Sequence, residues 1–337
     1  MKKKVNPAKF KIGNQIILKG ERKRVKLEIA SLYDYTKINI PIEVIRGLED
    51  GPIMFISAAI HGDEINGTEI IKRISQRIKK KSLKGTLILI PVVNLFGFYN
   101  KSRYLPDRKD LNRCFPGTRN GSLGSQIANV FMKEIVSKCT HGIDLHTGAI
   151  HRTNLPQIRA CIDDHQTKKM ALSFGAPVII NSKLRDGSLR EAARKKKVNF
   201  LLFEGGEALR FQDKIVKAGL NGCLSVMKDI GMLKTYENKT VKNLPFIAQS
   251  SYWVRAPHSG SFRILKKPGE HVEAKELLAV VSDPFGENPY NVYSKEAGVI
   301  VGLSEIPLVN KGDAMIHIAT SHGNAKTKLK NNIVDVI

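Results

Sequence analysis

The chain has 337 residues, 42% of them hydrophobic and 26% charged, and its formal net charge is +24 at pH 7. This length allows one large domain with a smaller appendage, and the ordinary apolar fraction is typical of a globular enzyme. No apolar run is long enough to span a bilayer. Residues 5–20 are too polar to be the apolar core of a signal peptide, although the chain starts with a basic segment.

The four cysteines show no C-x-x-C spacing; they are Cys114, Cys139, Cys161 and Cys223. We therefore expect neither a disulfide framework nor a structural zinc knot, and a reducing, cytoplasmic setting fits best. The lysines are spread along the chain, and the dense basic runs 21–26, 79–84 and 190–197 lack the interleaved aromatic residues that stack on bases. We therefore interpret the basic residues as solvated surface residues that also attract anionic substrates, and we do not expect nucleic-acid or membrane partners.

In chain order, apolar runs alternate with helical patterns. Strands are predicted at 53–60, 86–93, 142–146, 177–181 and 199–204, and helices at 66–80, 125–138 and 222–234. This alternation predicts a layered α/β domain over residues 1–243, in which 1–45 is a β-rich lead-in.

The polar stretch 236–243 predicts a linker, so we place a domain boundary near Leu244. Short strand-like segments separated by glycine and proline follow, which predicts a small β-barrel or sandwich over 244–320, and 321–337 is expected to be a loose tail. The β module reads like a biotinyl/lipoyl-type barrel. Because it lacks a Met-Lys-Met hairpin, we interpret it as a lid or an oligomerisation element.

The first candidate site follows strand 53–60. His61 and Glu64 are three residues apart on the turn before a helix, so they can share one face. An H-x-x-E motif alone is equally well explained by a surface histidine beside the acidic first turn of a helix. The motif gains weight from His146, which ends another buried strand and lies at the carboxyl edge of the predicted sheet. Two His and one Glu with an open fourth position are typical of a catalytic zinc.

Residues 94–117 form a long stretch without periodicity, which is more often functional than not within a compact domain. An arginine in this loop either holds a substrate carboxylate or ties down the loop itself. Further along, Glu204 ends a strand and precedes two glycines, so we expect it on a flexible turn at the same sheet edge, where it suits a general base. Glu207 is the rival candidate and is expected to be more solvated.

Four segments, taken together, resemble the succinylglutamate desuccinylase/aspartoacylase family, which is related to the M14-type zinc carboxypeptidases. They are the Ala59–Gly67 segment with its His61-Gly62-Asp63-Glu64 motif, the Asp110–Gly117 segment, Asp144-Leu145-His146, and Phe203-Glu204. The resemblance covers most of residues 40–235. It implies an α/β fold with a three-layer mixed sheet that has helices on both faces, and a small C-terminal all-β domain.

The resemblance also implies roles for individual residues. His61, Glu64 and His146 would bind one Zn²⁺ per chain, and Glu204 would act as general base and acid. Asn112 and Arg113 would hold a substrate carboxylate, and Arg103 would polarise the scissile carbonyl.

The function implied is hydrolysis of the amide bond in an N-acyl amino acid or a related small, anionic amide. A carboxypeptidase that acts on peptide C-termini is the alternative, because the same Asn-Arg pair would hold that carboxylate. A binding protein that has lost turnover is a further alternative. Residues 150–159 and 184–190 are expected to form the pocket walls that decide specificity, whereas the sequence leaves a homo-oligomer open.

Overall fold

The structure is a computed structural model, and it describes residues 9–236 and 244–321. A thirteen-stranded mixed sheet runs through the molecule in the order β12-β19-β17-β8-β10-β7-β5-β6-β4-β3, with β9, β11 and β14 paired at its side. Its central strands are β5 (Glu49–Ala58), β6 (Lys84–Ile90), β7 (His141–His146) and β10 (Asn199–Glu207), which run parallel to one another. Strands β8 (Arg152–Ala160) and β9 (Val178–Asn181) continue it on one side.

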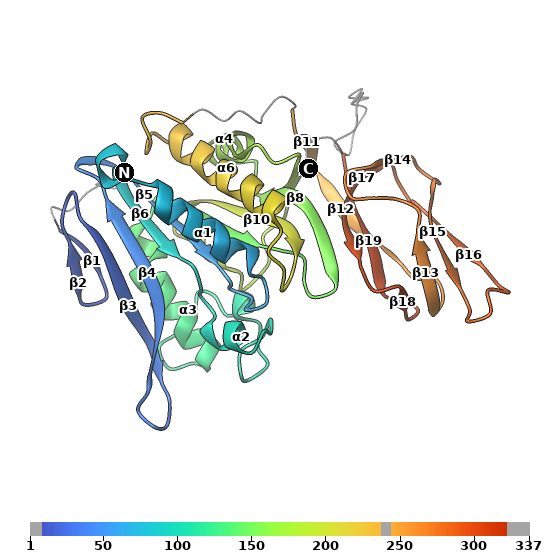
Figure 1. Cartoon of the computed structure of the whole chain (residues 1–337), viewed down its shortest axis with the longest axis horizontal. Coiled ribbons are helices and arrows are strands. Elements are labelled where there is room, and N and C mark those ends of the chain that lie inside the picture. Colours follow the sequence, from blue (N-terminus) through green and yellow to red (C-terminus); the bar gives the residue numbers. More distant parts are fainter. Residues whose placement is uncertain (1–8, 237–243, 322–337) are drawn as a thin grey trace.

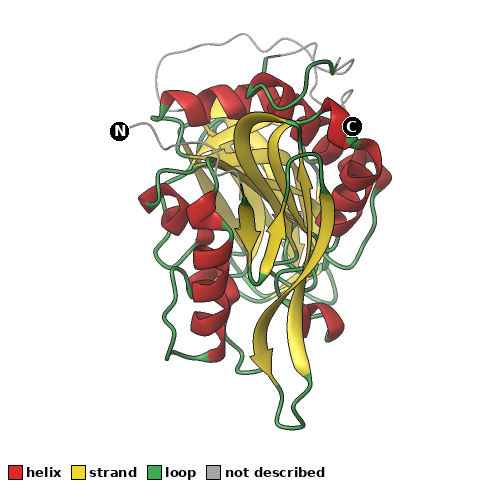
Figure 2. Ribbon diagram, turned by 90° about the vertical axis from the view of Figure 1, so that its left-hand side faces the viewer, coloured by secondary structure: helices red, strands yellow, loops and turns green. Residues whose placement is uncertain are grey.

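Helices cover both faces of this sheet, as Figure 2 shows. Alternate residues of β5 point to opposite faces, so Met54 and Ile56 belong to one core and Phe55 to the other. The first core is shared with α1 (Asn66–Arg77), α4 (His165–Phe174) and α6 (Asp213–Asp229), and the second with α3 (Leu123–Glu134) and α5 (Leu189–Lys195). The predicted three-layer α/β fold is confirmed.

The N-terminal strands are β1 (Phe10–Ile12), β2 (Gln15–Ile17), β3 (Arg22–Ser31) and β4 (Lys37–Arg46). In the edge strand β3, Val25, Leu27 and Ile29 are buried while the residues between them are exposed. Charged side chains on the exposed face of an edge strand discourage pairing with another chain. Strands β3 and β4 form the long hairpin that extends from the body of the molecule in Figure 1.

Several predicted elements have other bounds in the structure, and several observed elements were not predicted. Helix α6 begins nine residues before the predicted start at 222, and β8, α4 and α5 fall in segments for which no element was predicted. A short helix, α2 (Leu95–Tyr99), and the 3₁₀ turn η2 (Leu111–Arg113) lie in the predicted long loop. The 3₁₀ turns η1 (Lys80–Ser82) and η3 (Val136–Lys138) follow α1 and α3. The predicted linker and tail lie outside the described residues except at their first positions.

The C-terminal strands fall into two groups. Strands β11 (Phe246–Ala248), β12 (Ser250–Arg255), β14 (His271–Val272), β17 (Gly298–Ser304) and β19 (Ala314–Thr320) belong to the large sheet. Strands β13 (Gly260–Ile264), β15 (Leu277–Ser282), β16 (Tyr290–Tyr293) and β18 (Leu308–Val309) form a separate four-stranded sheet. Because β17 pairs with β8, and β11 with β9, backbone hydrogen bonds join this all-β part to the α/β part (Figure 1).

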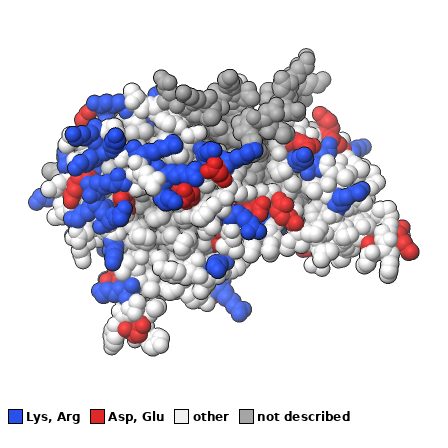
Figure 3. All heavy atoms as spheres, in the orientation of Figure 1, with Lys and Arg blue, Asp and Glu red and all other residues white. Residues whose placement is uncertain are grey.

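Among the described residues, none of the helices is both long enough and apolar enough to cross a membrane. On the face drawn in Figure 3, lysine and arginine side chains gather over the α/β part, and fewer cover the C-terminal strands. The positive charge is therefore unevenly distributed on this face.

Candidate active site

The turn between β5 and α1 holds His61 and Glu64 at the carboxyl end of the central strands. Its shape depends on Gly62, because a Cβ atom there would lie 1.9 Å from the backbone carbon of Gly97 in α2. Glycine alone permits this close approach of two backbones. The turn closes with a hydrogen bond from the Glu64 amide to the His61 carbonyl at 3.2 Å, which brings both side chains inward.

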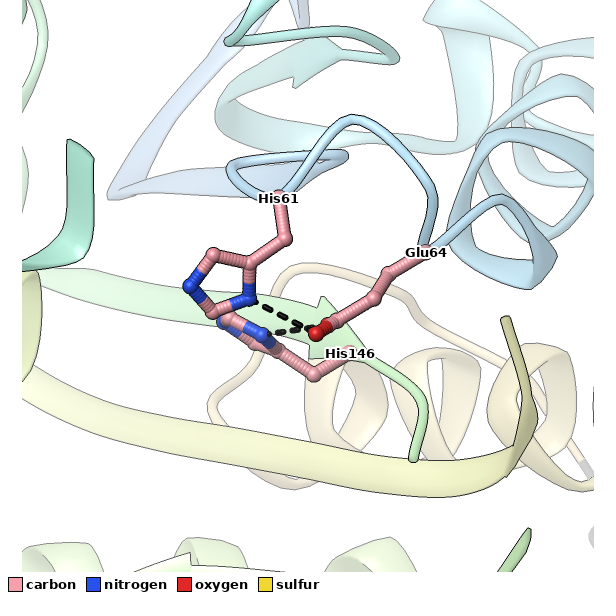
Figure 4. A group of neighbouring side chains, drawn as sticks. All are labelled: His61, Glu64 and His146. Carbon is pink, nitrogen blue, oxygen red and sulfur yellow. Dashed lines mark hydrogen bonds and ion pairs between the residues drawn. The ribbon is translucent and has the colours of Figure 1, made fainter. Parts of the chain in front are cut away.

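Three side chains from two elements converge at this edge, as Figure 4 shows. The two Glu64 carboxylate oxygens each lie 2.7 Å from an imidazole Nδ1, one from His61 and one from His146 at the end of β7. All three side chains are buried, and one donor atom of each lies within 4.8 Å of the others. The sequence motifs 82 residues apart are therefore brought into one cluster.

Both imidazoles are held by a second carboxylate through the opposite ring nitrogen. The Nε2 atom of His61 lies 3.1 Å from Asp110, and that of His146 lies 2.8 Å from Asp144. A carboxylate that accepts the Nε2 proton leaves Nδ1 to face the cluster, an arrangement common around metal-binding histidines. Two imidazole nitrogens and a carboxylate oxygen match the donor set of a catalytic zinc, so these residues fit a metal ion.

The charges of the carboxylate and the imidazoles in the cluster stabilise one another. Burial by itself raises the pKa of the Glu64 carboxyl, but the two histidines outweigh burial and hold this pKa well below its usual range. Burial opposes protonation of His146, yet the Asp144 and Glu64 carboxylates raise its pKa well above the ordinary value. The buried Glu64 carboxylate is thus stabilised by the imidazoles of His61 and His146.

Arg103 lies beside this cluster. Its guanidinium donates to Glu64 at 3.2 Å and to Asp110 at 3.0 Å, so it bridges a member of the cluster and the carboxylate that holds His61. The sequence alone left open whether an arginine of this loop ties down the loop or faces a substrate. Arg103 ties the loop to the cluster while it also lines the neighbouring cavity.

Asn112 and Arg113 lie on η2, the 3₁₀ turn that follows Asp110. The Asn112 side-chain oxygen accepts a hydrogen bond from the Leu189 amide at 2.9 Å, which fixes the start of α5 against this turn. The Arg113 guanidinium donates to the Asn112 carbonyl at 2.6 Å and is otherwise exposed toward the cavity. Asn112 thereby orients the turn, and Arg113 presents a cation.

Glu204 lies beside His146, its register partner on the neighbouring strand. The predicted flexible turn after Glu204 is wrong, because β10 continues to Glu207 through a β-bulge between Glu204 and Gly206. The extra residue lies on β8, where Leu155 and Pro156 stand opposite Gly205, so β10 itself continues without a break. Burial raises the pKa of Glu204, although Arg159 and the nearby histidines oppose the shift.

A cavity of about 770 Å³ contains every one of the predicted site residues. The predicted wall segments 150–159 and 184–190 do line it, through side chains such as Asn154, Arg159 and Arg190. The C-terminal module, interpreted from the sequence as a lid or an oligomerisation element, supplies three lining residues that the sequence analysis did not single out: Ser251, Trp253 and His317. No motif marks those residues, although a single tryptophan in the chain was a signal worth following.

Solved structures and a curated relative are similar to this chain over most of its length. It is 27% identical over 298 residues to the N-alpha-acetyl-L-2,4-diaminobutyric acid deacetylase of Halomonas elongata, covering 84% of this chain and 86% of that protein. The succinylglutamate desuccinylase/aspartoacylase structure from Rhodobacter sphaeroides matches with a TM-score of 0.79 at 22% identity, covering 89% of this chain and 96% of the other. The product-bound ectoine utilization protein EutE from Ruegeria pomeroyi matches with a TM-score of 0.80 at 23% identity, covering 89% and 95%.

These structural similarities at low identity establish the fold. A family model, the succinylglutamate desuccinylase/aspartoacylase catalytic domain, matches residues 50–230. The matched region is more than half of the chain and contains the His61, Glu64 and His146 cluster together with Glu204. The chain therefore belongs to the succinylglutamate desuccinylase/aspartoacylase family.

Proposed function

We propose that this protein is a zinc-dependent hydrolase that cleaves the amide bond of a small N-acyl amino acid and binds one Zn²⁺ per chain through His61, Glu64 and His146. The observation that carries the proposal is the convergence of these three donors in the lining of one large cavity. When bound in such a site, zinc supplies Lewis acidity that polarises a carbonyl and makes water a stronger nucleophile near neutral pH.

The chain's own residues supply the remaining chemistry. Glu204 lies beside His146 with a raised pKa, which suits a carboxyl that takes a proton from water and returns it to the leaving amine. Arg103 brings a permanent cation to the edge of the cluster, where it can stabilise the negative charge that develops on the carbonyl oxygen. Arg113 faces the cavity and suits a substrate carboxylate.

The cavity is strongly cationic, which favours an anionic substrate. Its seven lysine and arginine side chains are Arg103, Arg113, Arg152, Arg159, Lys183, Arg185 and Arg190, whereas its acidic side chains are Glu64 and Glu204. Within the described residues, the buried Nη1 of Arg190 has no hydrogen-bond partner, so it is available to an anion. A cationic side chain such as that in the Halomonas enzyme's named substrate would meet repulsion here.

The C-terminal strands favour a deacylase over a carboxypeptidase. Trp253 and Ser251 on β12, with His317 on β19, line the cavity as a wall, which suits a small substrate better than the extended chain of a peptide. The Halomonas relative is named a deacetylase of a small amino acid, which supports the same choice. The carboxypeptidase therefore ranks second.

The proposal is tested with protein purified without added metal. We expect a zinc content near one per chain in the wild type and turnover of N-acetyl or N-succinyl amino acids, with acidic ones preferred, but little cleavage of short peptides. His146→Ala should lose both zinc and turnover. Faster cleavage of the peptides would favour the carboxypeptidase, and bound zinc without any turnover would favour a binding protein.

A further inference from the structure

Two side chains on β8 contact the Glu204 carboxylate. Asn154 donates from its side-chain nitrogen to one carboxylate oxygen at 2.8 Å, and the Nε of Arg159 lies 3.7 Å from the other. A carboxylate only accepts hydrogen bonds, so the Asn154 amide must turn its nitrogen toward Glu204 and its oxygen away. Asn154 therefore holds the carboxylate by a hydrogen bond, and Arg159 adds an electrostatic attraction.

The oxygen of Asn154 lies against the C-terminal strand β17. Its register partner there is Gly302, and a Cβ atom at that glycine would lie only 2.7 Å from the Asn154 side-chain oxygen. The missing side chain at position 302 leaves the space that the Asn154 amide occupies. A residue on β17 therefore controls the orientation of a group that holds Glu204.

Arg159 is held by the C-terminal strands as well. One of its guanidinium nitrogens lies 3.5 Å from the Nδ1 of His317, on β19. Because a guanidinium can only donate, Nδ1 must be the acceptor and His317 carries its proton on Nε2, which lies 3.0 Å from the Ser251 hydroxyl. The Trp253 ring stacks on the His317 ring with centroids 4.6 Å apart, which fixes the plane of the imidazole.

The surroundings keep His317 neutral. Burial lowers the pKa of His317 to about 3, and the charges of Arg159 and Arg152 act in the same direction. The imidazole is therefore neutral near pH 7 and can accept from Arg159.

We propose that the C-terminal strands position the general base: Gly302 through Asn154, and His317 through Arg159, hold the Glu204 carboxylate where it can exchange protons with water. The inference rests on the proton-transfer role proposed above for Glu204. Asn154 and Arg159 are positioning residues, and the all-β part is a fixed wall of the active site, in contrast to the lid or oligomerisation element suggested by the sequence.

Gly302→Ala is the sharpest test, because it removes no functional group. The added methyl would lie 2.7 Å from the Asn154 side-chain oxygen, 3.3 Å from the Thr153 carbonyl oxygen and 3.4 Å from the Cβ of His317. The Asn154 amide is the nearest and most flexible of these groups, so it should shift most while the fold is kept. We expect kcat to fall about 10-fold to 100-fold, the scale of effect of a misplacement of about 1 Å, with KM and zinc content unchanged. Asn154→Ala should have a similar effect, and the double variant should be no worse than Asn154→Ala alone because both act on one contact.

Val301→Ala is the matched control. Val301 is the neighbouring residue on β17, but its side chain is buried in a hydrophobic cluster with Leu155 and Val178, which does not include Asn154. We expect this variant to lower the melting temperature and to keep the wild-type kcat. A wild-type kcat in Gly302→Ala, or independent effects that multiply in the double variant, would overturn the role of Asn154.

His317→Phe tests the second contact. It keeps a ring to stack on Trp253 but removes the acceptor for Arg159 together with the hydrogen bond between the His317 Nε2 and Ser251. The fluorescence of the single tryptophan should therefore report whether the wall stays intact. We expect a smaller fall in kcat than in Asn154→Ala, and an unchanged kcat would overturn this half of the proposal.

Crystal structures of the same variants give a reading that does not depend on turnover. The Glu204 carboxylate should be displaced in Gly302→Ala and Asn154→Ala but not in Val301→Ala. If the wild-type protein cleaves no amide, the proposed function is wrong. The crystal structures would then still test whether Asn154 and Gly302 determine the position of the Glu204 carboxylate. A Glu204 carboxylate that stays in place in both variants would overturn the proposed positioning.

Discussion

Asp144 and His146 lie two residues apart on strand β7, so their side chains share one face, and the Nε2 of His146 donates to the Asp144 carboxylate at 2.8 Å. The other Asp144 oxygen accepts from the Ser57 hydroxyl at 2.6 Å on the neighbouring strand β5. The buried carboxylate is thus fixed by the sheet and in turn fixes the imidazole. His146 consequently presents Nδ1 to Glu64 in a single orientation.

This relationship predicts the effect of Asp144→Asn. The amide cannot accept the Nε2 proton as strongly as a carboxylate, so the affinity for zinc should fall roughly 10-fold to 100-fold, as is usual when the partner of a metal-binding histidine is removed. Competition with a chromophoric chelator measures this affinity. Asp229→Asn, which removes an ion pair with Lys169 at the surface, is the control and should leave the affinity unchanged. Equal affinities in the two variants would contradict the prediction.

Glu204→Gln should separate metal binding from turnover. The substitution preserves size and removes the group proposed to carry protons, so kcat should fall about 100-fold to 10,000-fold. The zinc content should stay at the wild-type level, because Glu204 is not one of the three clustered donors. Metal analysis and steady-state kinetics on the same preparation check both parts. Glu207→Gln, three residues further along β10, is the matched control, and a similar loss there would favour that rival as the base.

Arg113→Ala should impair recognition of the substrate carboxylate more than the chemical step. Loss of one charge-assisted hydrogen bond costs about 1.5–3 kcal/mol, so kcat/KM should fall roughly 10-fold to 100-fold, mainly through KM. The same substrate with its carboxylate converted to an amide should be turned over about equally by both proteins. Arg119→Ala changes an exposed arginine on the following loop and should have no effect. A retained preference for the free acid in Arg113→Ala would refute the assignment.

His141 gives a prediction about stability and pH. Burial lowers the pKa of His141 to about 4, below the value of 6.5 expected in the unfolded chain. Between these two values the unfolded state binds more protons than the folded state, so the folded state loses stability as pH falls from about 6.5 to about 4. His141→Gln removes this contribution, and its free energy of unfolding relative to the wild type should improve from pH 7 to pH 5. Urea unfolding with excess chelator measures this difference, and a difference independent of pH would contradict the prediction.

The family, the fold class and the identity of the central residues followed from the sequence alone, for a local reason. His61 and Glu64 share one turn, His146 ends the buried strand β7, and Glu204 lies beside it on β10 as its register partner. Such strands can be read from a short window of sequence, and parallel strands bring their ends to one edge. The chemistry of that edge could be predicted without knowing the distances.

Only the tertiary structure decided what surrounds these residues. Three features join segments that are far apart in the sequence: the β-bulge between β8 and β10, the pairing of Gly302 with Asn154, and the wall of Trp253 and His317. No sequence motif predicts that β8 pairs with β17, because the hydrogen bonds between strands are made by backbone groups that nearly all residues share. The sequence therefore determined which groups could do the chemistry, and the long-range pairing of strands decided how they are held.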